Sequence, residues 1–268
     1  SPPSMLQIKK LFPQRKPDSN KGDFGRTLIV AGSSGMLGAA ILASRGALRV
    51  GSGLTYLAVP KELKNFANLA TPEIITLSFA EINKVKYTAA AIGPGLSLTG
   101  NISKLLNSLT PNPYPLVIDA SALDFFVPSK KARAPLILTP HPGEMARLIG
   151  KSVEFIQDHR TQIAIDTAKR LGCVIVLKGA KTVIASPDGK LYINSTGNPG
   201  MAKGGAGDVL CGMIAGLAAQ GHSPWDCAVA GVYLHGLAGD LAVKIKGEYA
   251  LTASDLTEKI ADALNRSR

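Results

Sequence analysis

The chain has 268 residues, of which 46% are hydrophobic and 18% are charged, so it carries enough apolar sequence for a sizeable buried core. Its formal net charge is +11 at pH 7, but the basic residues are spread along the chain and aromatic residues make up only 5%. This pattern argues against a nucleic-acid surface and favours an anionic small molecule as the partner.

Short apolar strands alternate with helices along most of the chain. We predict strands within the stretches 26–34, 54–59, 87–95, 115–121, 134–144 and 173–180, and helices within 36–51, 61–69, 98–109 and 158–172. A hairpin at 181–195 turns at Pro187-Asp188-Gly189. Two apolar helices follow at about 207–220 and 225–243, and a last one starts near 253, where Thr252 and Asp255 have capping-box spacing.

The predicted strands are continuously apolar, which is typical of strands buried on both faces. We therefore expect an α/β fold with a mostly parallel central sheet and helices on both faces. No linker or repeat divides the chain, so we expect one domain over residues 1–268, with 1–20 as an N-terminal extension. Ligands of such sheets bind beyond the carboxyl ends of the strands. The candidates there are Ser33, Ser34, Gly93, Pro94, Gly95, Asp119, His141, Glu144 and Lys178.

Three cysteines, Cys173, Cys211 and Cys227, lie in apolar runs without metal-binding spacing. We expect them to be reduced thiols of the core. No signal-like apolar segment opens the chain, and no apolar run reaches the roughly 20 residues of a membrane helix. These features predict a cytoplasmic protein that contacts neither membrane nor nucleic acid.

The segment "KGGAGDVLCG" is the strongest local signal. Gly204, Gly205 and Gly207 favour unusual φ angles and close approach to a ligand, and a helix is expected to begin near Gly207 or Asp208. The free N–H groups of a helix start bind anions. Asp208 has two interpretations: a carboxylate that caps the helix, or a general base beside a phosphate-binding loop. Capping alone does not require so many glycines, so we favour the base.

Other motifs are less specific. Gly212 and Gly216 share a helical face, and we favour close packing against a neighbour over a bound ligand. His141 and Glu144 could contact a ligand or metal, or Glu144 could be a first-turn carboxylate. Lys178 lies at a strand end, where composition favours a solvated turn, although beside an anion loop it could neutralise phosphate charge. His235, in an apolar helix, is expected to be a satisfied core histidine, and no Walker or Rossmann motif is present.

Several segments, taken in order, resemble the ADP/ATP-dependent NAD(P)H-hydrate dehydratases of the ribokinase-like superfamily. They are "GSSGMLGAA", "IGPGLS", "LTPHPGEMARL", "VLKGAKTVIASPDG" and "NSTGNPGMAKGGAGDVLCGMIAGL". The resemblance covers about residues 20–260 and fits the stand-alone form of the enzyme. It implies a lyase that repairs the S-epimer of NADH or NADPH hydrated at C6. ADP or ATP, with Mg2+, would phosphorylate the C6 hydroxyl, and phosphate would then leave.

The resemblance also implies the site. Asp208 is the expected base, and Gly205, Ala206 and Gly207 the expected anion hole. The residues Ala39, Gly95, His141 and Asp208 would contact the hydrated dinucleotide. The nucleotide donor would contact Lys178, Gly179, Ala180, Lys181, Thr182 and Gly207. Glu144 matches a position that orients Mg2+ through water. One departure concerns "DASAL", where relatives are expected to carry "DADAL", so that Ser121 replaces an aspartate.

Two alternatives remain on sequence grounds: a small-molecule hydroxyl kinase of the vitamin-precursor type, and a nucleotide-binding sensor without catalysis. The "HPGE" segment favours the dehydratase over the kinase, and Asp208 argues against a sensor, because a carboxylate near phosphates weakens binding. The sequence does not choose between ADP and ATP, although a stand-alone domain favours ADP. The resemblance further implies a homo-oligomer, often a tetramer.

Overall fold

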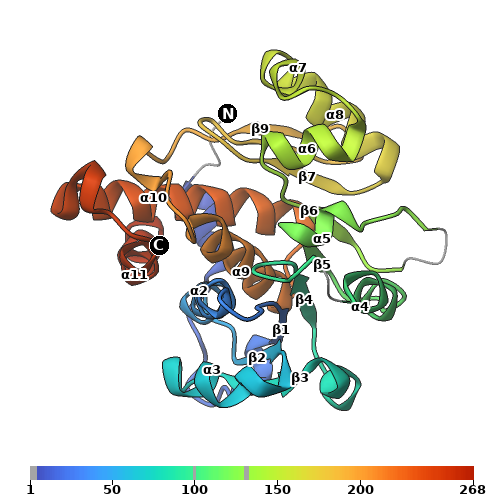
Figure 1. Ribbon diagram of the computed structural model, residues 1–268. Helices are drawn as coiled ribbons and strands as arrows, with labels where there is room; N and C mark the ends of the chain where they lie inside the picture. Colours follow the sequence, from blue (N-terminus) through green and yellow to red (C-terminus); the bar gives the residue numbers. More distant parts are fainter. Residues whose placement is uncertain (1–4, 99–100, 130–132) are drawn as a thin grey trace.

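The computed structural model describes residues 5–98, 101–129 and 133–268, and its centre is one nine-stranded sheet (Figure 1). The strand order is β3-β2-β1-β4-β5-β6-β7-β8-β9. The strands from β1 to β7 pair in parallel, whereas β8 and β9 pair antiparallel at one edge. Their bounds are β1 Arg26–Val30, β2 Leu54–Val59, β3 Ile75–Ser78, β4 Ala89–Ile92, β5 Leu116–Ile118, β6 Leu136–Leu138, β7 Val174–Leu177, β8 Val183–Ala185 and β9 Leu191–Ile193.

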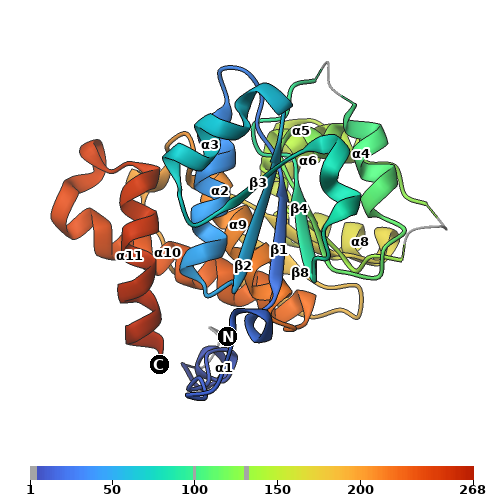
Figure 2. The ribbon, with the colours of Figure 1, turned by 90° about the horizontal axis from the view of Figure 1, so that it is seen from below.

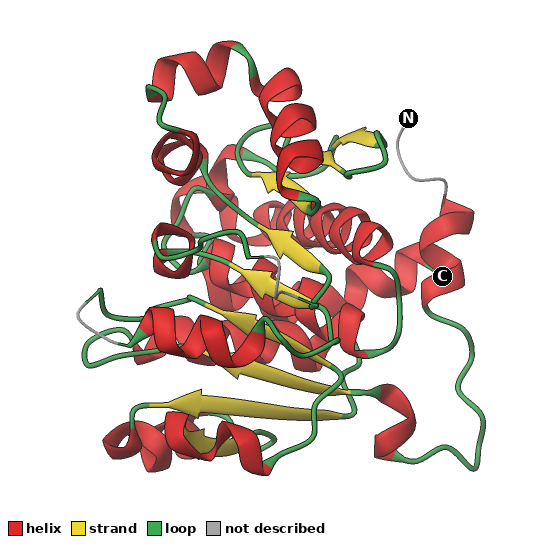
Figure 3. Ribbon diagram, turned by 90° about the vertical axis from the view of Figure 1, so that its right-hand side faces the viewer, coloured by secondary structure: helices red, strands yellow, loops and turns green. Residues whose placement is uncertain are grey.

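Helices cover both faces of this sheet (Figures 2 and 3). Alternate strand residues supply two cores: Ile29 belongs to the core under the helices α2, α9, α10 and α11, whereas Leu28 and Val30 face α4, α6 and α8. The expected α/β class with a mostly parallel sheet is therefore confirmed. The helices are α1 Met5–Leu11, α2 Leu37–Arg49, α3 Lys64–Ala70, α4 Ile102–Leu109, α5 Ser121–Asp124, α6 Pro142–Ile149, α7 Val153–Asp158, α8 Arg160–Leu171, α9 Ala206–Ala219, α10 Pro224–Ala250 and α11 Ala253–Ser267.

The helix α9 packs closely against α2. A Cβ atom on Gly212 would lie 1.7 Å from the Ala43 carbonyl oxygen, and one on Gly216 would lie 2.8 Å from Ala47 Cα. Both positions therefore need glycine for backbone contact, and the packing interpretation of the pair is confirmed. This contact fixes where α9 begins relative to the sheet edge.

The C-terminal half differs from expectation in α7, which precedes the predicted 158–172 helix, and in the length of α10. α10 has 27 residues, with a break at Gly247, and is longer than the predicted 225–243. By length and composition α10 could cross a membrane, which corrects the expectation that no run is long enough, but 61% of its most apolar window is buried in the protein. The predicted hairpin and the Thr252–Asp255 capping box are confirmed, and so are the three buried free cysteines.

Candidate functional site

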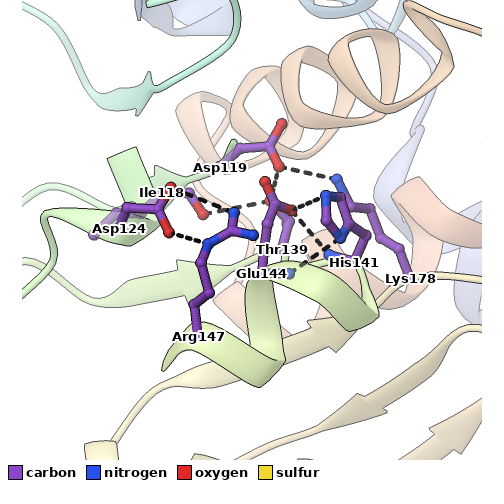
Figure 4. A network of polar contacts seen from close by, with 8 residues as sticks. All are labelled: Ile118, Asp119, Asp124, Thr139, His141, Glu144, Arg147 and Lys178. Atoms are coloured by element: carbon purple, nitrogen blue, oxygen red, sulfur yellow. Dashed lines mark hydrogen bonds and ion pairs between the residues drawn. The ribbon is translucent and has the colours of Figure 1, made fainter. Parts of the chain in front are cut away.

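A buried ion pair lies where β5, β6 and β7 end (Figure 4). Asp119 follows β5, Thr139 follows β6 and Lys178 follows β7, so their side chains meet at one edge of the parallel sheet. Lys178 Nζ lies 3.0 Å from Asp119 Oδ1, and the Thr139 hydroxyl donates to the same oxygen at 2.8 Å. Burial alone would lower the pKa of Lys178, but the nearby Asp119 and Glu144 carboxylates hold it above its ordinary value. The solvated-turn interpretation of Lys178 is therefore wrong.

Asp208 lies in the first turn of α9 without capping it. The N-cap residue is Gly205, and its position has no side-chain cap. The Asp208 carboxylate makes no hydrogen bond or ion pair with any residue that the structure describes. Burial, followed by the Asp119 carboxylate, raises the pKa of Asp208 to about 6, although Lys178 opposes the shift. The capping interpretation is thus wrong, and the carboxylate is left available for proton transfer at neutral pH.

The glycine-rich loop has one left-handed residue rather than three. Gly205 has φ +92°, while Gly204 and Gly207 lie outside the left-handed region, which corrects the expectation for those two. A Cβ on Gly207 would lie 3.3 Å from Lys178 Nζ, so glycine leaves room beside the ammonium group. The Ala206 N–H already donates to Lys203 O at 3.3 Å. The Ala206 N–H therefore already has an acceptor within the protein, and the anion-hole role of Gly205, Ala206 and Gly207 stays a prediction.

A cavity of about 580 Å³ opens beside this loop. It lies among the β7–β8 turn, the segment 194–202, the start of α9 and one face of α10. All six residues predicted to contact the nucleotide donor line it: Lys178, Gly179, Ala180, Lys181, Thr182 and Gly207. The structure thus gathers into one cavity a set that is split between two distant segments of the sequence. Their binding role stays a prediction.

His235 of α10 also lines the cavity. Its Nε2 donates to the Ala206 carbonyl oxygen at 2.8 Å, because a carbonyl can only accept. Burial lowers the pKa of His235 to about 4, so the ring is neutral at pH 7. The expectation of a satisfied histidine is confirmed, and the ring secures the first residue of α9.

The residues predicted to contact the hydrated dinucleotide come from two helices, α2 and α9, and from the segments that follow β4 and β6. Ala39 and Gly95 touch: a Cβ on Gly95, where φ is +66°, would lie 2.9 Å from Ala39 Cβ. His141 follows β6 and has a side chain that is 54% exposed. Asp208 lies in the first turn of α9. All four are at the carboxyl edge of the sheet, and their contact with a dinucleotide stays a prediction.

His141 and Glu144 form a capping box at the start of α6 (Figure 4). The Glu144 N–H donates to His141 Nδ1 at 3.1 Å, and the His141 N–H donates to Glu144 Oε1 at 2.9 Å. The first-turn role of Glu144 is therefore confirmed. Among the described residues, no three His, Cys, Asp or Glu side chains gather as a metal site. Any metal here would need ligands from water and substrate.

Asp119 and Ala120 were not predicted as site residues. Asp119, which we named as a strand-end candidate but not as a site residue, stands at the centre of the polar network. Its neighbour Ala120 has φ +51°, and Lys181 in the cavity wall has φ +55°; among the described residues, these are the non-glycine residues with positive φ. Strained backbone of this kind gathers at functional sites. The only sequence signal for Asp119 was its place after a central apolar strand.

Ser121 stands where an aspartate was expected, and its hydroxyl has two backbone carbonyl acceptors within hydrogen-bond distance. Its hydroxyl lies 3.1 Å from the Leu96 carbonyl oxygen and 3.3 Å from that of Gly93. The hydroxyl therefore stabilises the turn that carries Gly95. An ionised aspartate could not donate to either carbonyl.

Comparison with known proteins agrees with this geometry. The chain is 44% identical over 267 residues to the bifunctional NAD(P)H-hydrate repair enzyme Nnr of Moorella thermoacetica, covering 92% of this chain and 50% of that protein. It spans about half the length of the first curated relatives that it matches. It is 36% identical over 261 residues to the ADP-dependent (S)-NAD(P)H-hydrate dehydratase of Bacillus subtilis, covering 94% and 93% of the two chains.

Solved structures share the fold. The Bacillus subtilis ADP/ATP-dependent NAD(P)H-hydrate dehydratase, co-crystallised with ATP and Mg2+, matches with a TM-score of 0.93 at 35% identity over 99% of this chain and 98% of that one. A ribokinase-like superfamily protein of Enterococcus faecalis matches with a TM-score of 0.88 at 28% identity over 98% and 95%. The fold is therefore ribokinase-like. The NAD(P)H-hydrate dehydratase family model matches residues 27–262, and the chain belongs to this family.

Proposed function

We propose that the protein is a lyase that uses ADP or ATP to dehydrate the S-epimer of hydrated NADH or NADPH. The names of its relatives support this activity, and so does the arrangement of its site. The observation that carries the proposal is Asp208. It is a half-buried carboxylate without a hydrogen-bond partner in the described chain, its pKa is raised to about 6, and it lies beside the Lys178–Gly207 side of a 580 Å³ cavity.

The first chemical step would transfer a phosphoryl group. Asp208 removes the proton of the C6 hydroxyl, and the oxygen attacks the terminal phosphorus of the donor, whose bond to the bridging oxygen breaks. The N–H groups of Gly205 and Gly207 and the Lys178 ammonium face the charge that develops on the phosphoryl oxygens. The Asp119 carboxylate holds that ammonium in place.

The second step is elimination. Hydroxide is a poor leaving group, whereas phosphate is a good one. The ring nitrogen supplies the electron pair as the C6–O bond breaks, and loss of a C5 proton restores the C5=C6 double bond. The products are the reduced dinucleotide, phosphate and the spent donor. The protein's part is to hold the ring against the Ala39–Gly95 surface while the phosphate departs.

We include Mg2+ in the proposal as the counter-ion of the donor phosphates. Mg2+ prefers oxygen ligands, keeps several waters and is often bound through substrate phosphates and one or two carboxylates. The Glu144 carboxylate is close enough for its charge to raise the pKa of Asp208, although neither carboxylate lines the cavity. Glu144 fits an ion held mainly by water and phosphate, on which it would act through water. When bound, the ion would supply charge neutralisation to the phosphates.

Assembly and location follow from the family resemblance. We propose that the described residues form one domain, and that the protein is cytoplasmic, forms a homotetramer and acts on small molecules rather than on nucleic acid or membranes. Sedimentation of the purified protein at several concentrations would test the assembly, since a monomer at all concentrations contradicts it.

The test of the activity uses hydrated NADH prepared as a mixture of epimers. With Mg2+ and either ADP or ATP, the protein should restore the near-ultraviolet absorbance of NADH until the S-epimer is consumed, with one phosphate released per NADH. Phosphorylation of a simple alcohol without any recovery of NADH would replace the dehydratase by the kinase alternative. Nucleotide binding without either reaction would support a sensor.

A further inference from the structure

Arg160 is a cation in a place that helix electrostatics disfavour. It is the first residue of α8, where the helix dipole is positive and basic side chains lose stability. The first turn of α8 has no acidic residue, and its N-cap, His159, makes no capping hydrogen bond. A residue that breaks a local preference in this way often has a role that depends on the rest of the structure.

The Arg160 guanidinium lies behind the donor loop, which we define as residues 178–182. Its Nη2 donates to the Leu177 carbonyl oxygen at 3.0 Å, and its Nη1 donates to the Lys178 carbonyl oxygen at 3.2 Å. A Cβ added to Gly179 would lie 3.1 Å from Nη1, so the guanidinium fills the space beside this glycine. Gln157 accepts a further hydrogen bond from Nη1 at 3.1 Å.

The charge of Arg160 has no acidic partner. No carboxylate in the described residues lies within ion-pair distance, and burial lowers the pKa of the guanidinium, which nevertheless stays protonated. A half-buried, unpaired positive charge therefore stands directly behind the loop that lines the 580 Å³ cavity. An anion in that cavity would offset the cost of burying this charge.

The two hydrogen bonds also set the direction of a backbone donor. In a trans peptide the N–H points away from the C=O. Because Arg160 holds the Lys178 carbonyl on its own side, the Gly179 N–H points to the opposite side. Gly179 lines the cavity, whereas Arg160 does not. The Lys178 N–H donates to Pro140 O at 2.9 Å, while the Gly179 N–H has no acceptor among the described residues.

We propose that Arg160 is a positioning residue for the phosphorylated donor: it turns the Gly179 N–H into the cavity and places a positive charge behind it. This inference rests on the proposed function for the identity of the donor. Arg160 does not touch the hydrated dinucleotide, whose predicted contacts come from other segments of the chain. Substitution of Arg160 should therefore weaken binding of the nucleoside phosphate and leave binding of the hydrated dinucleotide unchanged.

The experiment compares Arg160→Met, Arg160→Lys and the control Arg170→Met in the full chain. Arg170 is an exposed residue in the last turn of the same helix, so its substitution removes one charge from α8 without touching the donor loop. For each protein, the Kd of ADP is measured by calorimetry, the KM of hydrated NADH by absorbance, and the unfolding temperature by circular dichroism.

Arg160→Met should raise the Kd of ADP by roughly tenfold or more, since two charge-assisted hydrogen bonds are lost. The KM of hydrated NADH should stay within about twofold. Arg160→Lys, which retains the charge but not the fork of donors, should give an intermediate Kd, and Arg170→Met should match the parent.

An unchanged Kd in Arg160→Met overturns the inference. So does an equal loss for both substrates with a lowered unfolding temperature, because that pattern indicates general damage. If the parent binds ADP but dehydrates nothing, the proposed function fails while the Kd comparison still tests Arg160. If the parent binds neither ADP nor ATP, both proposals fail.

Discussion

Lys178 Nζ and Asp119 Oδ1 are 3.0 Å apart although their strands, β7 and β5, are separated in the sheet by β6. The pair is possible because Thr139, at the end of β6, is short and donates to the same carboxylate oxygen. One buried positive and one buried negative charge are thereby fixed next to the start of α9. The electrostatics of Asp208 depend on this pair.

Asp119→Asn should destabilise the protein by roughly 3 kcal/mol, because it leaves the Lys178 charge buried without its counter-ion. Asparagine still accepts hydrogen bonds, which keeps the loss at the low end of the range for broken buried pairs. Urea unfolding measures the change. Glu258→Gln, which breaks the exposed Arg49–Glu258 pair, should cost no more than about 1 kcal/mol, and an equal effect of both substitutions would contradict a buried role for Asp119.

The rate should depend on the ionisation of Asp208. Since burial raises the pKa of Asp208 to about 6, kcat/KM should fall about tenfold per pH unit below pH 6. Asp119→Asn removes a negative neighbour and frees Lys178, so it should lower the pKa of Asp208 and move this limb to more acidic pH. A rate that is flat from pH 7 to pH 5 would show that Asp208 is not the titrating base.

The contribution of Asp208 to the free energy of unfolding should change with pH in the opposite direction to the rate. The pKa of Asp208 is higher in the folded protein, so its protonated form is favoured there, and stability is lost as pH rises through about 6. Asp208→Asn should therefore stabilise the protein at pH 7.5 by up to about 3 kcal/mol, with no gain below pH 4. Urea unfolding at both pH values measures the difference, and a variant that is less stable than the parent at pH 7.5 would refute the raised pKa.

The α2–α9 contact should not tolerate a methyl group. Gly212→Ala places a Cβ 1.7 Å from the Ala43 carbonyl oxygen, so the helices must separate, and the cost should be about 3 kcal/mol or more. Gly38→Ala is the control in a helix, because a Cβ there meets nothing within 4 Å and should gain up to about 1 kcal/mol. Equal unfolding midpoints for the two variants would show that the contact is not needed.

Ser121→Asp restores the residue expected in relatives but should impair this chain. The carboxylate cannot donate to the Gly93 and Leu96 carbonyls and repels them, so the turn carrying Gly95 should loosen. We expect a KM for hydrated NADH raised several-fold with an unchanged Kd for ADP. A lower KM in Ser121→Asp would mean that the hydroxyl does not position this turn.

The sequence predicted the strands of the sheet other than the edge strand β3, Ile75–Ser78, because apolar runs and the hairpin turn are local signals. β3 was missed because Leu77 is its only buried residue, so it lacks the continuous apolar pattern of the other strands. The sequence also predicted packing at Gly212 and Gly216 from their helical spacing. The ion pair of Lys178 could not be predicted, because its partner Asp119 is distant in the chain and a lysine before a glycine is usually solvated. The capping question at Asp208 was likewise settled only by backbone geometry at Gly205. The length of α10 was missed because Gly and charged residues after 243 resemble a helix end.

The proposed mechanism depends on Asp208 taking the proton of the substrate hydroxyl. The most direct measurement is the rate of NADH recovery from its hydrate by Asp208→Asn, with ADP binding measured on the same preparation. ADP should bind as tightly as in the parent or more tightly, because a negative charge is removed, while the rate should fall by roughly 100- to 10,000-fold. A variant that binds ADP and retains a rate close to that of the parent would contradict the claim.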